Sequence, residues 1–148
     1  MGGELLAMVE VVPFEPRDYE QVIALWEATE GLTLREADSR EAVLAYVRRN
    51  PGLSFVVRDG SLIVGAVLAG TDGRRGYLQH LAVAPPYRGR GIGRTLAERV
   101  VEALSGMGVA KCHLMVRREN ERAKAFWEHL GWSVRDDISL MSHADPGV

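Results

Sequence analysis

The feature that most limits how this chain can fold is the dipeptide Asp59-Gly60, which separates two apolar segments, residues 53–58 and 61–69. Asp-Gly supplies the positive φ angles of a type I′ turn, and this turn joins two antiparallel strands without splaying them. A second polar segment, residues 71–76, follows, and an apolar segment returns over residues 77–83. The sequence therefore predicts three consecutive antiparallel strands.

Helices are predicted on both sides of these strands, where apolar residues recur at three- and four-residue steps. Asp38, followed three residues later by Glu41, is expected to cap one helix, and Gly131 is expected just beyond the last one. The helical segments are residues 18–30, 38–49, 93–105 and 120–130; further strands are expected at 8–14 and 111–116, with one or two more in 132–141. The predicted order β-α-α-β-β-β-α-β-α-β indicates one mixed α/β domain over residues 1–148.

Composition narrows the function classes. Eighteen Lys and Arg against twenty Asp and Glu give a net charge of −2, which argues against a nucleic-acid-binding protein. Cys112 is the single cysteine and the four histidines lack zinc-site spacing, so we expect no disulfide and no metal. Met1–Leu6 has no basic leader pattern, and no apolar segment reaches the roughly 20 residues of a membrane-spanning helix. We expect a cytoplasmic protein with no membrane partner.

The segment Tyr87–Thr95 lies between a predicted strand and a predicted helix and combines glycines with arginines. Glycines let main-chain N–H groups approach an anion at a helix N-terminus, and arginines add cationic donors, so a ligand with phosphate groups is expected. A dinucleotide fingerprint fails because Arg94 or Leu96 stands where its last glycine belongs, and no Gly-Lys-Ser/Thr of a P-loop follows. The alternative is a glycine-rich turn with a solvated basic face.

This segment resembles the pyrophosphate motif of the GNAT superfamily of N-acetyltransferases, in which Arg or Gln is followed by x-x-Gly-x-Gly or Ala. The resemblance extends over about residues 53–132. The matching residues are Arg88, Gly91 and Gly93 in the motif, residues 80–85 before it, and Asn120, Ala123, Phe126, Gly131 and Trp132 after it.

The resemblance implies a mixed, mostly antiparallel central sheet flanked by helices and splayed between its fourth and fifth strands, with acetyl-CoA as co-substrate. The main-chain N–H near Val83 would face the thioester carbonyl as an oxyanion donor. The cofactor-binding residues that it implies are Leu81, Ala82, Val83, Arg88, Gly89, Arg90, Gly91, Ile92, Gly93, Arg94, Thr95, Asn120, Phe126 and Trp127.

The residues that would handle protons depart from the family pattern. Trp127 stands where relatives often place a Tyr that protonates the leaving thiolate, and an indole has no proton to give near neutral pH. Tyr77 and Gln79 stand where relatives carry a Glu or His base, and Met115 replaces a Glu on the fifth strand. Gln79 could position a water, whereas Tyr77 would need a much lowered pKa.

Other polar residues have a functional and a plain interpretation. Strand alternation places His80 with Leu78 and Ala82, opposite Tyr77 and Gln79, so a packed or surface histidine is favoured over a catalytic one. Glu27 and Glu30 could act through water but fit a solvated helix end, and Arg74 and Arg75 could attract an acceptor carboxylate or only solubilise a turn. Cys112 is expected to be a buried strand residue.

We therefore expect an N-acetyltransferase that moves an acetyl group to a primary amine by direct attack on the thioester. Without a base the amine must be neutral already, which favours the α-amine of a peptide or small molecule over a lysine side chain. The alternative is a non-catalytic acyl-CoA-binding module, and a nucleic-acid-binding α/β domain is disfavoured by charge. The sequence leaves room for a homodimer.

Overall fold

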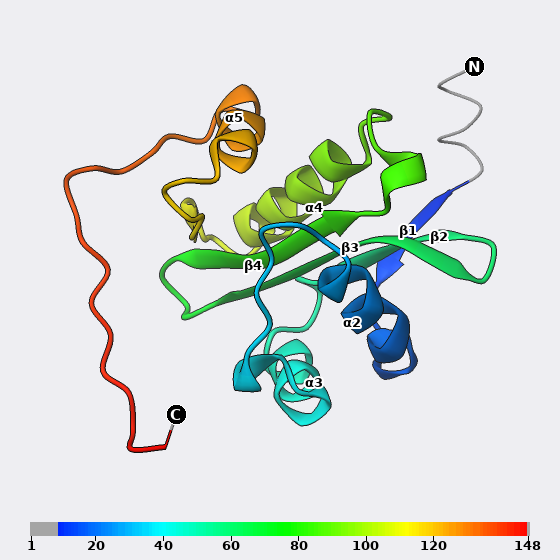
Figure 1. Cartoon of the computed structure of the whole chain (residues 1–148), viewed down its shortest axis with the longest axis horizontal. Coiled ribbons are helices and arrows are strands. Elements are labelled where there is room, and N and C mark those ends of the chain that lie inside the picture. The colour runs from blue at the N-terminus through cyan, green and yellow to red at the C-terminus, as the bar shows by residue number, and fades with distance from the viewer. Residues whose placement is uncertain (1–8, 148) are drawn as a thin grey trace. The chain divides into compact units, whose positions relative to one another are not determined.

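The computed structural model describes residues 9–147, and the sheet in this part of the chain has the strand order β1-β2-β3-β4-β5 (Figure 1). The first four strands are paired antiparallel, and β5 lies parallel to β4, which confirms the three consecutive antiparallel strands. Two predictions fall on residues outside the described part of the chain: the start of the first strand at Met8, and the lack of a leader pattern in Met1–Leu6. The strands are β1 (Glu10–Pro13), β2 (Phe55–Asp59), β3 (Leu62–Thr71), β4 (Gly76–Val83) and β5 (Cys112–Leu114).

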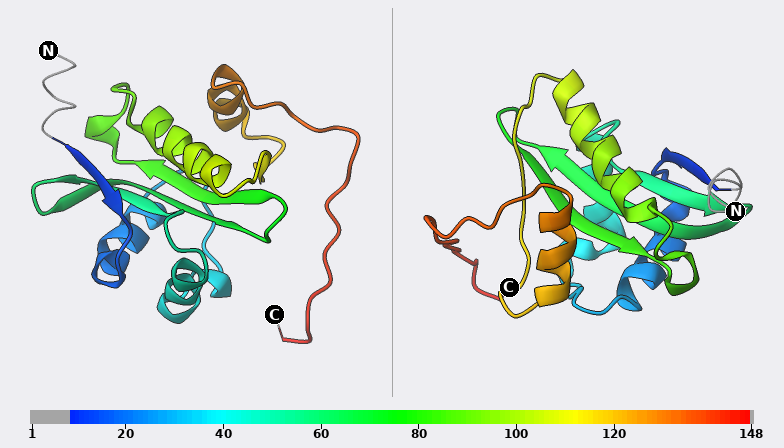
Figure 2. Two further views of the ribbon diagram at one scale, coloured as in Figure 1. Left: turned by 180° about the vertical axis from the view of Figure 1, so that it is seen from behind. Right: turned by 90° about the horizontal axis from the view of Figure 1, so that it is seen from above.

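The chain divides into two compact parts, Met1–Met115 and Val116–Val148, which are described separately. In the first part, α2 (Tyr19–Glu27) and α3 (Arg40–Arg49) cover one face of the sheet and α4 (Ile92–Gly106) covers the other (Figures 1 and 2). Short 3₁₀ turns at Pro16–Asp18, Glu36–Asp38 and Pro85–Tyr87 (η1, η2 and η3) precede the three helices.

Two glycines of β3 allow these helices to pack closely on the sheet. A Cβ atom on Gly65 would lie 3.3 Å from the Ile92 side chain of α4, and one on Gly70 would lie 2.4 Å from the Tyr46 hydroxyl of α3. On the α2 and α3 face, Trp26, Val22 and Val43 are fully buried. The core is therefore formed by both helix layers against β3 and β4.

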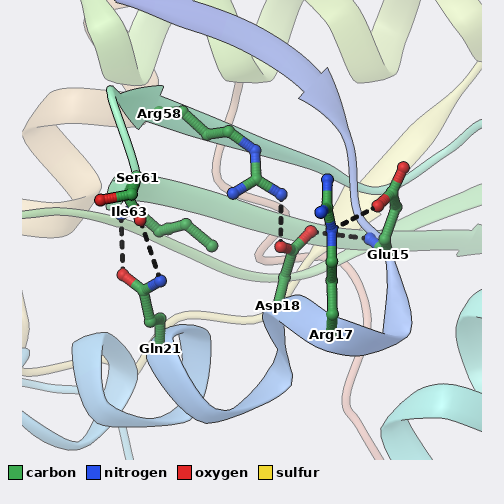
Figure 3. A network of polar contacts seen from close by, with 7 residues as sticks. All are labelled: Glu15, Arg17, Asp18, Gln21, Arg58, Ser61 and Ile63. Atoms are coloured by element: carbon green, nitrogen blue, oxygen red, sulfur yellow. Dashed lines mark hydrogen bonds and ion pairs between the residues drawn. The ribbon is translucent and has the colours of Figure 1, made fainter.

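Polar side chains fasten α2 to the β2–β3 hairpin (Figure 3). Asp18 is 2% exposed and forms an ion pair with Arg58 of β2. The Gln21 amide donates to the Ser61 carbonyl at 3.1 Å and accepts from the Ile63 N–H at 2.9 Å, so it satisfies both kinds of main-chain group at the turn. These contacts hold the turn in place over the first helix.

The turn itself differs from the prediction. Asp59 stays in β2 and pairs with Leu62, so the two turn residues are Gly60 and Ser61 rather than Asp59 and Gly60. Gly60 has a φ of +61°, whereas Ser61, like the other non-glycine residues between 9 and 147, has no positive φ; this is the sign pattern of a type II′ turn rather than type I′. The Asp59 carboxylate accepts a hydrogen bond from the Tyr87 hydroxyl, and this contact uses Asp59 in an extended conformation.

The start of α3 is also displaced by one residue from its predicted cap. Ser39, not Asp38, is the N-cap, and its hydroxyl accepts from the Ala42 N–H at 3.2 Å. Asp38 is buried and its carboxylate accepts from the Arg35 N–H at 3.0 Å. The carboxylate is thus used by the turn before the helix instead of by the helix.

The second part contains α5 (Glu121–His129), and Gly131 follows it with a φ of +94°, as expected of a residue just past a helix end. The strands predicted in residues 132–141 are wrong, because no described residue beyond α5 is in a strand. Asp136 falls in the middle of this segment at a position where the apolar alternation needs an apolar residue, and the ion pair between Arg135 and Asp137 flanks it. Its apolar side chains, such as Val134 and Leu140, are exposed.

Candidate functional site

The neighbouring strands β4 and β5 separate halfway along β4. They pair only over Gly76–Leu78 and Cys112–Leu114, and β5 ends at Leu114. Residues 80–83 of β4 pair with β3 alone, so in the described part of the chain their other edge carries no strand. This confirms the predicted splay between the fourth and fifth strands.

A β-bulge lies at the point of separation. His80 pairs with Leu68 and Leu78 pairs with Ala69, so Gln79 is the extra residue of β4. Because the bulge shifts the alternation by one, His80 lies on the α2 and α3 face while Leu78 lies on the α4 face. The prediction that His80 and Leu78 share a face is therefore wrong.

The His80 side chain is held by groups distant in sequence. Its Nε2 lies 2.8 Å from the Asp38 carboxylate, and its ring centroid lies 4.8 Å from that of Trp26. The Tyr19 hydroxyl donates to the Asp38 carbonyl at 2.7 Å. The predicted packed histidine is confirmed, and its contacts explain the bulge: His80 must face α2 to meet Asp38.

The loop between β4 and α4 presents a row of main-chain donors. Gly89 and Gly91 have φ angles of +78° and +81°, and Gly91 is the N-cap of α4. The N–H groups of residues 89–94 form no hydrogen bond to any described residue, and no side chain caps the helix. Six adjacent donors therefore meet the positive end of a 15-residue helix, which is the arrangement that binds anions.

Aromatic and cationic side chains brace this loop. Arg88 donates from Nε to the Val83 carbonyl at 2.9 Å, and its two terminal NH₂ groups have no partner among the described residues. The Arg90 guanidinium carbon lies 5.2 Å from the centre of the Tyr87 ring. The Tyr87 hydroxyl in turn donates to Asp59, and this hydrogen bond raises the pKa of Tyr87. The loop is thereby joined to β4 and to the β2–β3 hairpin.

Most of the other residues predicted to bind the cofactor have side chains that are buried or already have a partner. Ala82, Val83 and Ile92 are buried, and Leu81 is half-buried. The Thr95 hydroxyl donates to the Gly91 carbonyl at 2.9 Å. Arg94 forms an exposed ion pair with Glu98 at 3.8 Å; Gly93 lies in the first turn of α4.

The residues predicted to act on the acceptor lie at the other half of β4. The Tyr77 hydroxyl donates to Asp72 at 3.1 Å, and this hydrogen bond raises the pKa of Tyr77, whereas a base would need a lowered pKa. Gln79 is exposed, and its amide nitrogen lies 3.5 Å from the Tyr46 hydroxyl. Sequence reasoning missed Tyr46, because only the tertiary packing of α3 brings it within reach of a residue 33 positions away.

Cys112 of β5 is half-buried, and burial raises the pKa of its thiol to about 11. A thiol with such a pKa is protonated at neutral pH, so it is a poor nucleophile. Residues 9–147 contain no group of three His, Cys, Asp or Glu side chains that could hold a metal ion. None of the helices in those residues is long and apolar enough to cross a membrane.

The remaining predicted residues lie in the second part of the chain. The Asn120 side-chain oxygen caps α5 by accepting from the Ala123 N–H at 3.0 Å. Trp127 packs edge-on between Phe126 and Trp132, with ring centroids 5.0 Å away on each side. Local packing thus accounts for the position of Trp127, and the cap accounts for that of Asn120.

Comparison with known proteins places this geometry in one family. The model of the acetyltransferase (GNAT) family matches residues 19–132. The chain is 36% identical over 132 residues to an acetyltransferase of Pectobacterium atrosepticum, covering 89% of this chain and 93% of that one. It resembles the solved PaiA N-acetyltransferase of Thermoplasma acidophilum in complex with coenzyme A, with a TM-score of 0.75 at 22% identity over 86% of this chain and 91% of that one. The ribosomal-protein-alanine N-acetyltransferase of Escherichia coli has a TM-score of 0.68 at 23% identity, covering 84% of this chain and 77% of that one.

Proposed function

This chain belongs to the acetyltransferase (GNAT) family, and on that premise we propose that it transfers the acetyl group of acetyl-CoA to the α-amine of a peptide or small molecule. The observation that carries the proposal is the row of six unpaired N–H groups at residues 89–94, next to the open edge of β4. The similar PaiA N-acetyltransferase was solved with coenzyme A, which supports the same ligand class here.

The pyrophosphate of the co-substrate would accept hydrogen bonds from the main-chain donors of the loop and from the free end of Arg88. A helix N-terminus and adjacent amides bind such a group without any side-chain reorganisation. The pantetheine arm would then run along residues 81–83, where β4 lacks a second neighbour. Contacts from Asn120, Phe126 and Trp127 in the second part of the chain remain predictions.

The reaction that these residues support is direct attack of the amine on the thioester. The Val83 N–H would stabilise the oxyanion, and loss of one such donor costs about 3 kcal/mol of transition-state stabilisation in other enzymes. The leaving group is a thiolate, whose conjugate acid is far stronger than an alcohol, so it departs without a general acid and can take its proton from water. The proposal therefore does not require a proton from Trp127.

The acceptor class follows from the residues that stand where relatives carry a carboxylate base: Tyr77, Gln79 and Met115 have none, and His113 of β5, whose ring centroid lies 6.0 Å from that of Tyr77, stays an undecided candidate. Only a neutral amine attacks, and at pH 7 about 1 in 2500 lysine side chains is neutral, compared with about 1 in 6 α-amines. The contact that raises the pKa of Tyr77 strengthens this argument. The structural resemblance to an enzyme named for a ribosomal-protein alanine supports an α-amine acceptor.

A thiol-release assay with acetyl-CoA and a panel of amines tests the proposal. We expect release that depends on the added amine and is faster with α-amines than with lysine side chains of matched peptides. Arg88→Gln should weaken coenzyme A binding, whereas Arg135→Gln, in an exposed ion pair of the second part, serves as the charge-matched control. Tight binding of coenzyme A without amine-dependent release would contradict the proposal and favour a binding module.

The lone cysteine predicts a cytoplasmic location, and the net charge of −2 predicts that nucleic acid is not a partner. A homodimer stays a prediction.

A further inference from the structure

Three segments meet at the end of the sheet where β3 turns into β4, at the left of Figure 1. The Thr71 N–H donates to the Asn50 side chain at 3.0 Å, which brings the C-terminal end of α3 to the turn. The Gly76 N–H donates to the Lys111 carbonyl at 2.8 Å, which brings the start of β5 to the same turn. These hydrogen bonds place residues 48–50, 71–76 and 111 side by side.

Cationic side chains dominate this end of the sheet, which we call the basic end. All are exposed, and none forms an ion pair with a carboxylate in the described part of the chain, although other arginines there do. The attraction of arginines to a helix C-terminus accounts for two of the five, but not for those on the turn and on β5. They are Arg48, Arg49, Arg74, Arg75 and Lys111.

Asp72, the one acidic residue of these segments, offsets only part of their charge. Asp72 accepts from the Arg74 and Arg75 N–H groups at 2.8 and 2.9 Å and from the Tyr77 hydroxyl. The hydrogen bonds from the Arg75 and Arg74 amides lower the pKa of Asp72, so its charge is present throughout the neutral range. Its lone pairs serve the turn. The Arg75 guanidinium donates one hydrogen bond to the Arg74 carbonyl at 3.1 Å, and the other guanidinium donors of the two arginines are left to bind other anions.

On the basis of the proposed function, we propose that the basic end binds the carboxylates of an acidic peptide whose N-terminal amine is the acceptor. From Gly76 to Leu81, β4 advances by about 16 Å at roughly 3.3 Å per residue. An extended peptide covers a similar distance per residue. The long arginine side chains reach toward it, so the distance between its amine near Leu81 and its carboxylates at the basic end is shorter than the full length of the strand. The carboxylates would therefore lie about three to five residues after the acetylated amine.

A short acidic peptide fits better than a nucleic acid. The whole chain has a net charge of −2, so a long polyanion that extended beyond the basic end would meet repulsion. A short peptide with a few carboxylates can pair with the five cations of the basic end and does not extend to the rest of the surface.

The test compares two heptapeptides with a free N-terminal alanine, one with glutamates at positions 4–6 and one with glutamines. At low salt and saturating acetyl-CoA we expect kcat/KM to be about tenfold higher for the glutamate peptide, since a few exposed ion pairs and steering contribute modestly. Arg74→Gln with Arg75→Gln should reduce this preference to about twofold and leave the glutamine peptide unaffected. The charge-matched control is Arg17→Gln with Arg40→Gln, two exposed residues outside the basic end, which should keep the full preference.

Equal kcat/KM for the two peptides, or a preference that survives the Arg74 and Arg75 changes, would overturn the inference. Fluorescence anisotropy of the labelled glutamate peptide, measured without acetyl-CoA, reports peptide binding alone. It therefore tests the inference about the basic end independently of the proposed function. If neither peptide is acetylated, the proposed function fails, while weaker peptide binding by the double variant still supports the basic end. Tighter binding of a single-stranded oligonucleotide of equal charge would overturn the choice of a peptide.

Discussion

The two ends of β4 present positive charge in different ways. Beyond Val83, the donors are main-chain N–H groups of residues 89–94, fixed by positive-φ glycines and by the start of α4. Before Gly76, the charges are the long, exposed side chains of the basic end, while the main chain of the turn is satisfied by Thr71 and Asp72.

On the two proposals made above, one strand serves two kinds of anion. Rigid main-chain donors suit a ligand whose shape does not vary, and they require no reorganisation on binding. Flexible, solvated arginines tolerate carboxylates in several positions, but their contribution is small and is screened by salt. We expect selectivity for the co-substrate at the first end and a broader preference among acceptors at the other.

The largest predicted effect is on stability. It should come from removing the contact between Asp38 and His80, which lies at the bulge between the two ends of β4. Asp38→Ala removes the acceptor for the Arg35 N–H and the partner of the His80 ring, and should lower the free energy of unfolding by about 3 kcal/mol because both groups lose a hydrogen bond. Urea unfolding followed by circular dichroism measures this change. Glu36→Ala, at an exposed position two residues earlier, should change stability by less than about 0.5 kcal/mol. Similar stabilities for the two variants would show that the bulge does not depend on Asp38.

The next effect should be confined to the glycine loop. Gly91→Val places a β-branched residue at a φ of +81°, where strain of about 2 kcal/mol should displace the N–H groups and weaken coenzyme A binding about 30-fold. Gly52→Val is the matched control, because Gly52 has a φ of +80° and open space around it but lies outside the loop. Calorimetric titration with coenzyme A should give a normal affinity for the control. An unchanged affinity in Gly91→Val would mean that the loop is not the binding site.

The smallest predicted effect is a rise in the kcat/KM preference for the glutamate peptide. Loss of the arginines of the basic end should lower this preference, whereas loss of the Asp72 charge should raise it. Asp72→Asn keeps a side-chain oxygen for the Arg74 and Arg75 amides but removes a charge that the lowered pKa of Asp72 maintains across neutral pH. The kcat/KM preference for the glutamate peptide should therefore rise about twofold at low salt, consistent with an exposed charge. This gain should fade at 0.5 M salt, where the screening length is only a few ångströms. A fall in the preference would indicate that Asp72 holds the turn chiefly through its charge.

Local sequence signals predicted most of the fold. Apolar periodicity located the helices, and Gly131 marked the end of α5 because a positive φ beyond a helix is a local requirement. Asp59-Gly60 predicted the hairpin, but not its turn type, because the Asp59 side chain has a partner 28 residues away. The glycine loop was predictable for the same reason, because Gly89 and Gly91 have positive φ angles that favour glycine.

What the sequence could not predict depends on distant contacts. The bulge at Gln79 follows from the pairing of His80 with Asp38, and these residues are separated by 42 positions. Convergence at the basic end needs the hydrogen bonds of Asn50 and Lys111, which no spacing indicates. The strands expected in residues 132–141 are not formed in the described part of the chain, where Asp136 stands between Val134 and Ile138 at a position that the alternation needs to be apolar.

The hydrogen bond between Tyr87 and Asp59 links a hairpin to the loop that follows β4. Asparagine in place of Asp59 would fit the end of β2, but its amide oxygen would be a weaker acceptor for the Tyr87 hydroxyl than the carboxylate. Phenylalanine in place of Tyr87 would remove the reason for keeping a carboxylate there. As such chains diverge, substitutions at these two positions should therefore occur together, even though neither would touch the transferred acetyl group.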